Sequence, residues 1–316
     1  MDDPARLVRD LDWNLLRTFV VLADARSITE AAETLRLKQP SVSAALKRLE
    51  DRIGKPLIDR RPGRFRLTRA GEILRREAVE IEGSILRLAT SLRDVTDEVT
   101  GLVRVALASH VVCPLFDGVL AGFHAAHPKA RLRLDVMPSP DAIGEVTAMR
   151  AALAVCLVRD RNPRLEYRRL YREFFGLFCG PPHPAFGRRG LGPADMAGQA
   201  SVSFETDQLD DVLKPVTLMR AEAGLGEAIV GRSSHLEEVR RMIVAGLGVG
   251  PLPVHVAARD VAAGLLWQVP PYDRLPALDV HVVWNPRAQL NRAEAAFLAG
   301  LLDRIEATPI AARTYR

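Results

Sequence analysis

The sequence has few of the residues from which disulfide frameworks and metal sites are built. It contains three cysteines in 316 residues, Cys113, Cys156 and Cys179, and their odd number and wide spacing argue against a disulfide framework and a zinc site. It also lacks an apolar run of membrane-spanning length and a signal-peptide pattern. These absences predict a cytoplasmic chain with no metal, no cofactor and no membrane contact.

The net positive charge of the chain is small, but it is concentrated in one segment. The net charge is +5, whereas the segment from Arg36 to Arg76 alone carries 13 Lys and Arg against 4 Asp and Glu. The rest of the chain is slightly acidic, so the positive excess belongs to this segment. A local excess of this kind is the electrostatic pattern expected for contacts with nucleic-acid phosphates.

The basic segment includes a pattern typical of a helix-turn-helix over residues 25–48. Ser27 and Glu30 have the Ser-x-x-Glu spacing of a capping box and predict the start of a short helix. After a turn over residues 36–38, Pro40 lies near the first position of a second helix, where its missing N–H costs least. One face of this second helix is small, polar and basic and fits a major groove. The other face is apolar and consists of Val42, Leu46, Leu49 and Ile53.

Residues 56–68 form two short extended runs around Pro62-Gly63, which predicts a β-hairpin wing. Helix pairs with a solvated basic face also occur in proteins that bind no DNA, so the two helices alone leave both interpretations open. The wing and the local charge together favour DNA binding. The residues expected to contact DNA are Gln39, Pro40, Ser41, Ser43, Lys47, Arg48, Arg60, Arg61 and Arg64.

A seven-residue repeat predicts a coiled coil after the wing. Its apolar positions, spaced alternately by four and three, are Leu74, Ala78, Ile81, Ile85, Leu88, Leu92, Val95 and Val99. An amphipathic helix lying on its own domain would instead show a broader stripe with a period of about 3.6 residues. We therefore expect these residues to join two chains and to present two DNA-binding motifs to an inverted repeat.

From residue 101 onward, apolar runs of strand length alternate with helical patterns, which predicts an α/β domain with parallel strands. The expected strands are residues 102–107, 131–137, 153–158, 174–178, 202–204, 249–251 and 279–284. The expected helices are residues 114–126, 236–245 and 292–305, with a further helix from residue 254. The sequence contains no nucleophile elbow and no phosphate-binding loop, so nothing in it indicates an enzyme.

The N-terminal motifs resemble those of the LysR-type transcriptional regulators. The matching positions are Leu15, Phe19, Ser27-x-x-Glu30-Ala31-Ala32, Gln39-Pro40-Ser41-Val42-Ser43, Leu46-x-x-Leu49-Glu50, Gly54-x-Pro56-Leu57, Arg60-Arg61 and Leu67-Thr68-x-Ala70-Gly71, with a weaker match at residues 243–253. The resemblance implies an α/β protein with an N-terminal winged helix-turn-helix, a long coiled-coil linker helix and a C-terminal effector domain of two subdomains, like periplasmic binding proteins. It also implies a homodimer or homotetramer, with RNA polymerase as a further candidate partner.

On this resemblance, the chain has three parts. Residues 11–68 would bind DNA, residues 69–99 would form the linker and residues 100–316 would bind the effector. Within the last part, subdomain I would hold about residues 101–170 and 276–316, and subdomain II about residues 171–275. A thiol redox switch, which some regulators of this family use, stays open as well, although Cys156 lies in an apolar run and is expected to be buried.

Three positions depart from the family pattern. Lys38 stands where the family usually has Ser or Thr, so the second helix lacks a hydroxyl cap. Ala44 stands where an arginine often follows the motif, so a long side chain that could contact bases is missing. We therefore expect the small polar residues of the helix and the wing to contact the bases, and Lys47 and Arg48 to contact mainly phosphates. The strand at Ala154 begins without the family's usual Asp.

Ligands of open α/β sheets bind at the carboxyl ends of the strands. By this rule, the expected effector residues are Ser109, His110, Ser139, Phe204, Thr206, Gly248 and Val249. Ser109 is expected just ahead of a helix, whose free N–H groups and dipole favour an anion, so we expect a small carboxylate. A lone Ser in a loop is more often a cap or turn residue, and His110 is either a pH-sensitive contact or a plain surface residue.

Three functions remain open at this point. The chain is a ligand-responsive transcriptional regulator, an enzyme with a regulatory DNA module, or an architectural DNA-binding protein without an effector. The absence of catalytic motifs argues against the enzyme. The long α/β half argues against the architectural protein, because bending DNA requires no such domain. The residues therefore favour the regulator.

Overall fold

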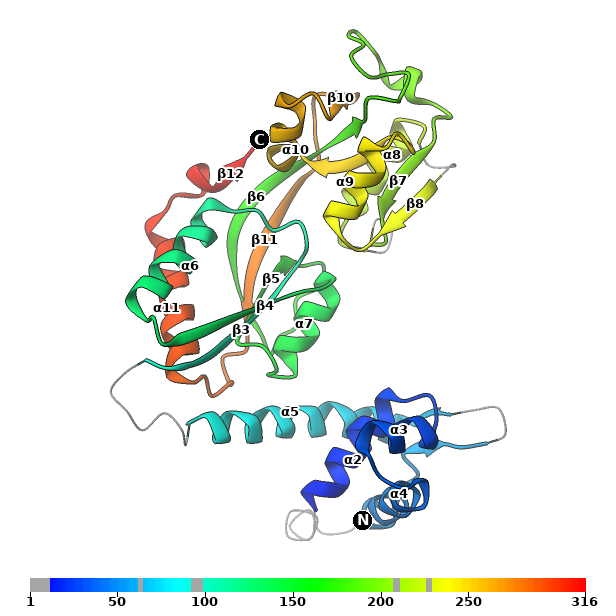
Figure 1. The fold of residues 1–316 in the computed structure, drawn as a ribbon, viewed down its shortest axis with the longest axis vertical. Helices are drawn as coiled ribbons and strands as arrows, with labels where there is room; N and C mark the ends of the chain where they lie inside the picture. The colour runs from blue at the N-terminus through cyan, green and yellow to red at the C-terminus, as the bar shows by residue number, and fades with distance from the viewer. Residues whose placement is uncertain (1–11, 62–64, 92–98, 207–210, 226–228) are drawn as a thin grey trace. The chain divides into compact units, whose positions relative to one another are not determined.

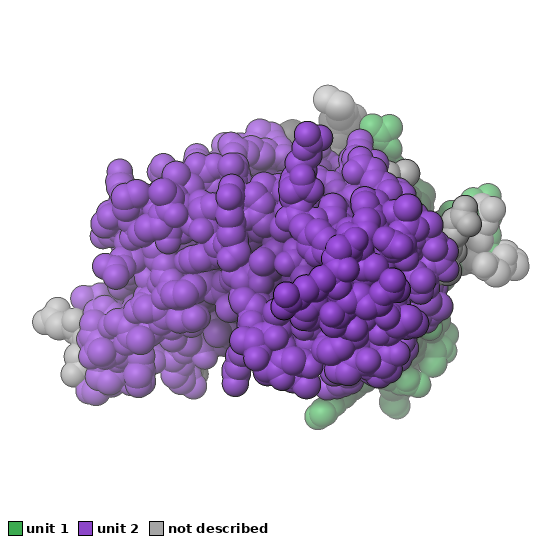
Figure 2. Space-filling view, turned by 90° about the horizontal axis from the view of Figure 1, so that it is seen from above, with its two compact units in different colours: residues 1–89 green, residues 90–316 purple. Residues whose placement is uncertain are grey.

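The chain divides between residues 89 and 90 into two units, which are coloured green and purple in Figure 2. The computed structural model describes residues 12–61, 65–91, 99–206, 211–225 and 229–316, without the side chains of residues 86–91. The residues singled out above that lie outside this description are Pro62, Gly63, Arg64, Leu92 and Val95, together with the side chain of Leu88.

The first unit combines helices with a two-stranded wing (Figure 1). Its described elements are α2 (Trp13–Asp24), α3 (Ile28–Leu35), α4 (Gln39–Ile53), β1 (Ile58–Asp59), β2 (Arg66–Leu67) and α5 (Arg69–Ser91). The inner faces of the first three helices are buried at Leu16, Phe19, Ala31, Leu46 and Leu49. This core holds α3 and α4 in the helix-turn-helix arrangement that the sequence predicts.

The helix starts and ends follow the local signals. The Ser27 hydroxyl accepts the N–H of Glu30 at 3.1 Å, which confirms the predicted cap of α3. The Glu30 carboxylate accepts a hydrogen bond from the N–H of Arg26 at 2.6 Å. In a capping box it would instead accept the N–H of the N-cap residue, Ser27. Arg36 ends α3 in the left-handed region, with φ of 54°, and Lys38 precedes α4 without a side-chain cap, as predicted.

The predicted wing is present. Strands β1 and β2 pair antiparallel, with Ile58 opposite Leu67 and Asp59 opposite Arg66. The Thr68 hydroxyl accepts the N–H of Gly71 at 3.1 Å and donates to the carbonyl of Pro56 at 2.7 Å. The end of the wing is thereby tied to both its own beginning and the first turn of α5.

The second unit contains the remaining elements. Its strands are β3 (Gly101–Leu107), β4 (Ala130–Val136), β5 (Leu153–Leu157), β6 (Glu166–Cys179), β7 (Ser201–Phe204), β8 (Ile229–Ser233), β9 (Gly250–Pro253), β10 (Trp267–Val269), β11 (Ala277–Trp284) and β12 (Thr314–Tyr315). Its helices are α6 (Pro114–Ala126), α7 (Ser139–Thr147), α8 (Lys214–Glu222), α9 (Leu236–Val244), α10 (Val254–Ala262) and α11 (Arg292–Ala307), with short 3-10 turns at η1 (Pro193–Met196) and η2 (Ile310–Arg313).

The sheet of this unit is mixed, not parallel throughout. Its strand order is β10-β6-β11-β5-β3-β4, and β9 and β12 also pair with β6. The prediction of parallel strands holds for β3 with β4 and β5, and for the separate pair β7 and β8. It is wrong for β11, which runs antiparallel to β5 and β6, and for β9 and β10, which run antiparallel to β6. Figure 1 shows β6 and β11 as the long strands that connect the two halves of the unit.

Two helical layers cover strands β3, β4 and β5. Helix α7 packs on β5 and β3, whereas α11 packs on β3 and on α6, on the other side of the sheet (Figure 1). Most predicted elements match within one or two residues, and α6 matches at both ends. Strand β6, predicted over residues 174–178, is 14 residues long, and α7 and α8 are missing from the prediction.

Helix α5 carries the predicted heptad positions, which differ in exposure. Ala78 is fully buried within the first unit and Leu74 is half-buried. The assignment of Val99 to the seam is wrong, because it lies in the second unit and packs against the core there. Ile81 and Ile85 are instead 39% and 38% exposed, although both are large and apolar. Water contact with apolar surface of this kind is unfavourable. These two side chains are therefore the described part of the seam that is free to meet a second chain.

We predict that Ile85→Lys weakens self-association. The change places a charge in the middle of the expected helix pair, where a buried unpaired charge is strongly destabilising. Sedimentation of the purified variant should show a lower mass than the wild type at the same concentration. Ser84→Lys adds the same charge beside the seam and should sediment like the wild type. An unchanged mass for Ile85→Lys would exclude this seam as the interface.

Candidate nucleic-acid interface and ligand cleft

The outer face of α4 presents the residues expected to meet DNA. Gln39, Pro40, Ser41, Lys47 and Arg48 are exposed, and Ser43 is half-buried. The inner face holds the helix on its core through Val42, Leu46 and Leu49, each at most 1% exposed. A rigid helix with short polar side chains at its start and cations one to two turns later can approach base edges and phosphates together.

The wing depends on Glu50, which we did not single out as a functional residue. Its Oε1 accepts the N–H of Leu57 at 2.8 Å and that of Ile58 at 3.3 Å. Its Oε2 accepts from Nη2 of Arg60 at 2.7 Å. One carboxylate therefore fixes the first strand of the wing to the end of α4. The sequence signal was present, because Glu50 is among the positions that match the family motif.

Two predicted DNA-contacting arginines of the wing are ion-paired within the chain. Arg60 forms an ion pair with Glu50, and the guanidinium of Arg61 forms a bidentate ion pair with the carboxylate of Asp59 at 2.9 and 2.6 Å. Arg61 is largely exposed, and exposed pairs contribute little to stability, so a phosphate can compete for this guanidinium group. The two arginines present less free positive charge than the sequence count suggests.

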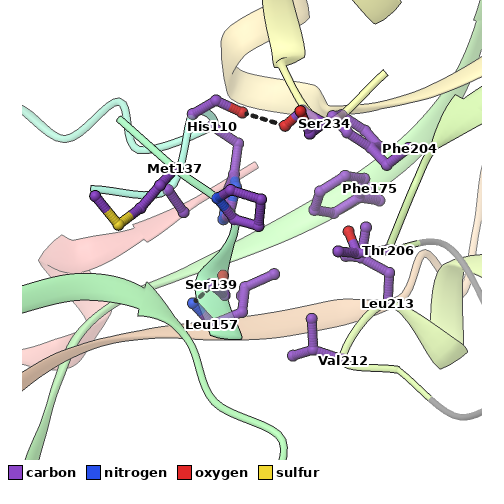
Figure 3. A pocket seen from close by; sticks show the side chains of 13 residues that line it. His110, Met137, Ser139, Leu157, Phe175, Phe204, Thr206, Val212, Leu213 and Ser234 are labelled. Carbon is purple, nitrogen blue, oxygen red and sulfur yellow. Dashed lines mark hydrogen bonds between the residues drawn. The ribbon is translucent and has the colours of Figure 1, made fainter. Parts of the chain in front are cut away.

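A cleft lies between the two halves of the second unit (Figure 3). Its lining residues are Ala108, Ser109, His110, Met137, Pro138, Ser139, Leu157, Phe175, Phe204, Thr206, Val212, Leu213 and Ser234. Five of the seven predicted effector residues are among them. Among the described residues that line it, none is a Lys, Arg, Asp or Glu. A ligand would meet hydroxyl groups, an imidazole and apolar side chains there.

The cleft is almost closed. The cavity inside it has a volume of about 20 Å³, which is room for about one water molecule. The ring of His110 lies between Met137 and Phe175 in Figure 3, with Thr206 and Val212 across the opening. A ligand larger than water therefore requires the two halves to move apart.

Ser109 joins the two sides of the cleft. Its Oγ accepts the N–H of Leu236, the first residue of α9, at 3.1 Å, and its hydroxyl donates to the carbonyl of Ser234 at 3.1 Å. The expectation that Ser109 lies just ahead of a helix of its own is wrong, because α6 begins only at Pro114 with Cys113 as N-cap. Ser109 instead caps a helix 127 positions further along the chain.

The other predicted effector residues differ in whether they line the cleft. Ser139 lines the cleft, but it is 6% exposed and its Oγ accepts the N–H of Leu157 at 3.2 Å, so it also holds α7 to β5. Gly248 and Val249 do not line the cleft. The N–H of Val249 donates to the carbonyl of Ala200, and a Cβ on Gly248 would meet that carbonyl oxygen at 2.4 Å. These two residues serve close backbone packing.

His110 has a buried carboxyl group behind it. Its Nε2 lies 3.5 Å from Oε1 of Glu173, whose side chain is fully buried. Neither oxygen of Glu173 nor Nε2 of His110 has a partner with hydrogen-bond geometry. Burial lowers the pKa of His110 to about 4, with a smaller contribution from the charge of His255. Burial raises the pKa of Glu173 well above its usual range, and the hydroxyl of Tyr171 offsets part of this rise.

Glu173 is a site residue that the sequence reasoning missed. It was visible as the one acidic residue beside the apolar run of residues 174–178. In a strand, alternate side chains share a face, so Glu173 lies on the same face as Phe175, which lines the cleft.

The three cysteines are buried within the second unit. Burial raises the pKa of the Cys156 and Cys179 thiols to about 12, so neither forms the thiolate that reacts with oxidants. The Sγ of Cys113 lies 3.6 Å from the hydroxyl of Tyr315. Within the described ranges, no three His, Cys, Asp or Glu side chains gather as metal ligands, and no helix is long and apolar enough to cross a membrane.

Comparison with known proteins gives matches over nearly the whole chain. Residues 13–72 match the profile described as "Bacterial regulatory helix-turn-helix protein, lysR family", and residues 96–306 match "LysR substrate binding domain". The hydrogen peroxide-inducible genes activator of Pectobacterium carotovorum subsp. carotovorum is 24% identical over 289 residues, covering 90% of this chain and 91% of that protein.

Two solved structures share the fold. Full-length CbnR complexed with its target DNA has a TM-score of 0.61 at 18% identity, covering 94% of this chain and 99% of that one. Full-length LysG from Corynebacterium glutamicum with bound effector arginine has a TM-score of 0.55 at 20% identity, covering 94% and 98%.

We predict that Ser109→Ala loosens the start of α9. Loss of a side-chain cap costs about 1 kcal/mol, which corresponds to about fivefold faster hydrogen exchange at Leu236 and the amides that follow it. Ser234→Ala keeps the carbonyl that accepts from Ser109 and serves as the control, with exchange at Leu236 near the wild-type rate. Equal exchange in Ser109→Ala and wild type would show that the hydroxyl does not hold the cleft closed.

Proposed function

The chain belongs to the LysR-type family of bacterial transcriptional regulators, and we propose that it binds an inverted-repeat operator under the control of a small carboxylate in the cleft. Membership makes it a DNA-binding regulator that responds to an effector, rather than an enzyme. The inverted repeat, the carboxylate and the individual contact residues are the proposed part.

The proposal of a carboxylate effector rests on the position of the α9 N-terminus. The N–H of Leu236 points to the cleft residue Ser109, at the positive end of the helix dipole. A carboxylate oxygen can take the place of the Ser109 hydroxyl and accept this N–H as a stronger, charge-assisted bond. The hydroxyl groups of Ser109 and Thr206 then provide further donors. LysG, which shares the fold, binds arginine, an effector with a carboxylate.

This replacement gives the effector a means of control. With the cleft nearly closed, an effector binds the open arrangement far better than the closed one, and so shifts the population toward it. The Ser109 contact with α9 holds the closed arrangement. A change in the effector domain then alters how the two winged motifs of an assembly meet their half-sites. We propose the dimer through α5 as the smallest assembly, with the tetramer and RNA polymerase contact as extensions of it.

Peroxide sensing is the second candidate, because a relative is a hydrogen peroxide-inducible activator. The buried cysteines argue against it, since a peroxide-reactive thiol needs thiolate character and access. A footprint of the purified protein on its own upstream region separates the two candidates. We expect small carboxylates to change the footprint and to raise the melting temperature by mass action, and peroxide to do neither. A footprint changed by peroxide alone would favour the thiol.

We predict different effects for the two kinds of residue on α4. Arg48→Ala should lower affinity for all DNA sequences by a similar factor and reduce the salt dependence by about one counterion, because Arg48 is assigned to a phosphate. Ser43→Ala should leave the salt dependence unchanged and reduce the preference for the operator over unrelated DNA. Salt titrations and competition binding measure both quantities. The assignment is wrong if Arg48→Ala relaxes sequence preference at an unchanged salt slope.

A further inference from the structure

The buried surroundings of His110 come from several distant parts of the chain. Strand β6 supplies Glu173 and Tyr171, α10 supplies His255, and the segment before α6 supplies Cys113. The rings of Tyr171 and His255 are 6.1 Å apart, and Nε2 of His255 lies 3.1 Å from the carbonyl of Val112. Tyr315 of β12 packs on the rings of both Tyr171 and His255.

Within the part of the chain that the structure describes, the ion-pair partner of Glu173 is His110. A fully buried carboxylate without a partner costs several kcal/mol, about as much as breaking a buried pair. The pair therefore holds one proton, on Glu173 or on His110. A 3.5 Å contact is long for a hydrogen bond, and contacts of this kind often shorten once a ligand is bound.

The position of this proton decides what His110 offers to the cleft. A neutral imidazole has one N–H donor and one acceptor nitrogen. With the proton on Glu173, its O–H donates to Nε2, so the hydrogen of the ring must be on Nδ1. With the proton on Nε2, the ring is an imidazolium with an N–H at both nitrogens. Nδ1 carries a hydrogen in both cases, and it is the nitrogen left for a ligand because Nε2 is turned to Glu173.

We propose that Glu173 is a positioning residue that makes His110 an Nδ1–H donor to the cleft and transfers its proton to Nε2 when a carboxylate binds. The O–H bond of Glu173 breaks, the N–H bond at Nε2 forms, and the pair becomes carboxylate and imidazolium without a proton from solvent. The first half concerns the protein alone. The second half rests on the proposed carboxylate effector.

The transfer explains how a cleft without a described Lys or Arg can select an anion. A carboxylate beside Nδ1–H stabilises a positive charge on the ring. The charge appears only when the ligand is present, so the empty cleft does not bear the cost of a buried cation. A carboxamide of the same shape would draw no proton and would bind more weakly.

Histidine side-chain nitrogen NMR on the full-length protein tests the first half. The His110 signals are those that disappear in His110→Gln. At neutral pH we expect a neutral ring with its hydrogen on Nδ1 in the wild type. Glu173→Gln, whose amide N–H can donate to Nε2, should keep this tautomer, and Glu173→Leu should lose it. A hydrogen on Nε2 in the wild type, or the same tautomer in Glu173→Leu, would overturn the positioning role. If Glu173→Leu does not fold, the wild type and Glu173→Gln decide.

Acetate, compared with acetamide, tests the second half on the same samples. In the wild type, acetate should convert the His110 signals to those of an imidazolium, and acetamide should not. Glu173→Gln cannot give up a proton, so its acetate affinity should fall about tenfold, the difference between a charged and a neutral contact. Acetate that binds the wild type and leaves His110 neutral would overturn the transfer. No acetate binding to the wild type would count against the carboxylate effector, while the tautomer would still decide the role of Glu173.

Discussion

The continuous pairing of β6 with β11 is the constraint on which the second unit depends. These two strands run antiparallel from one half of the unit to the other, so the halves cannot separate without bending a hydrogen-bonded ribbon. The ribbon is irregular at one point, between Val280 and His281, where the register shifts opposite Leu170. Such bulges bend and twist a strand pair locally. Opening of the cleft is therefore expected as a small rotation about this point rather than a large translation.

The same part of the ribbon carries the buried groups beside the cleft. Tyr171 and Glu173 follow the irregular point within three residues, and Glu173 lies behind His110. A rotation about this point changes the distance between Glu173 on the ribbon and His110 on the segment after β3. It also changes whether Ser109 can reach the first turn of α9. Ligand contact, proton position and cleft opening are thus coupled through one short stretch of strand, which is a physical link between sites.

The sequence predicts the parts of the structure that depend on neighbouring residues. The cap at Ser27, the missing cap at Lys38 and both ends of α6 follow from local signals. The sequence predicts β6 too short because the first half of the strand is polar, and its Arg169 and Arg172 pair with Asp279 of β11, 110 and 107 positions away. The partner of Ser109 lies 127 positions away, which no local pattern can reveal. Gly248 and Val249 were chosen by the carboxyl-end rule, but they precede β9 and so lie at its other end.

Positive charge is distributed unevenly between the DNA-binding unit and the effector-binding unit of the chain. The DNA-binding unit holds the local positive excess, yet Arg60, Arg61 and Arg75 are paired with Glu50, Asp59 and Asp24. Replacing Glu50 by a phosphate as the partner of Arg60 costs free energy. The reason is that the Glu50 carboxylate also accepts the backbone N–H groups of Leu57 and Ile58 in the wing. Lys47 and Arg48 of α4 are exposed and have no ion pair among the described residues, so both charges are available to phosphates. We therefore propose that operator preference comes from close fit at the start of α4 and from the spacing of two motifs, since long-range attraction alone does not distinguish sequences.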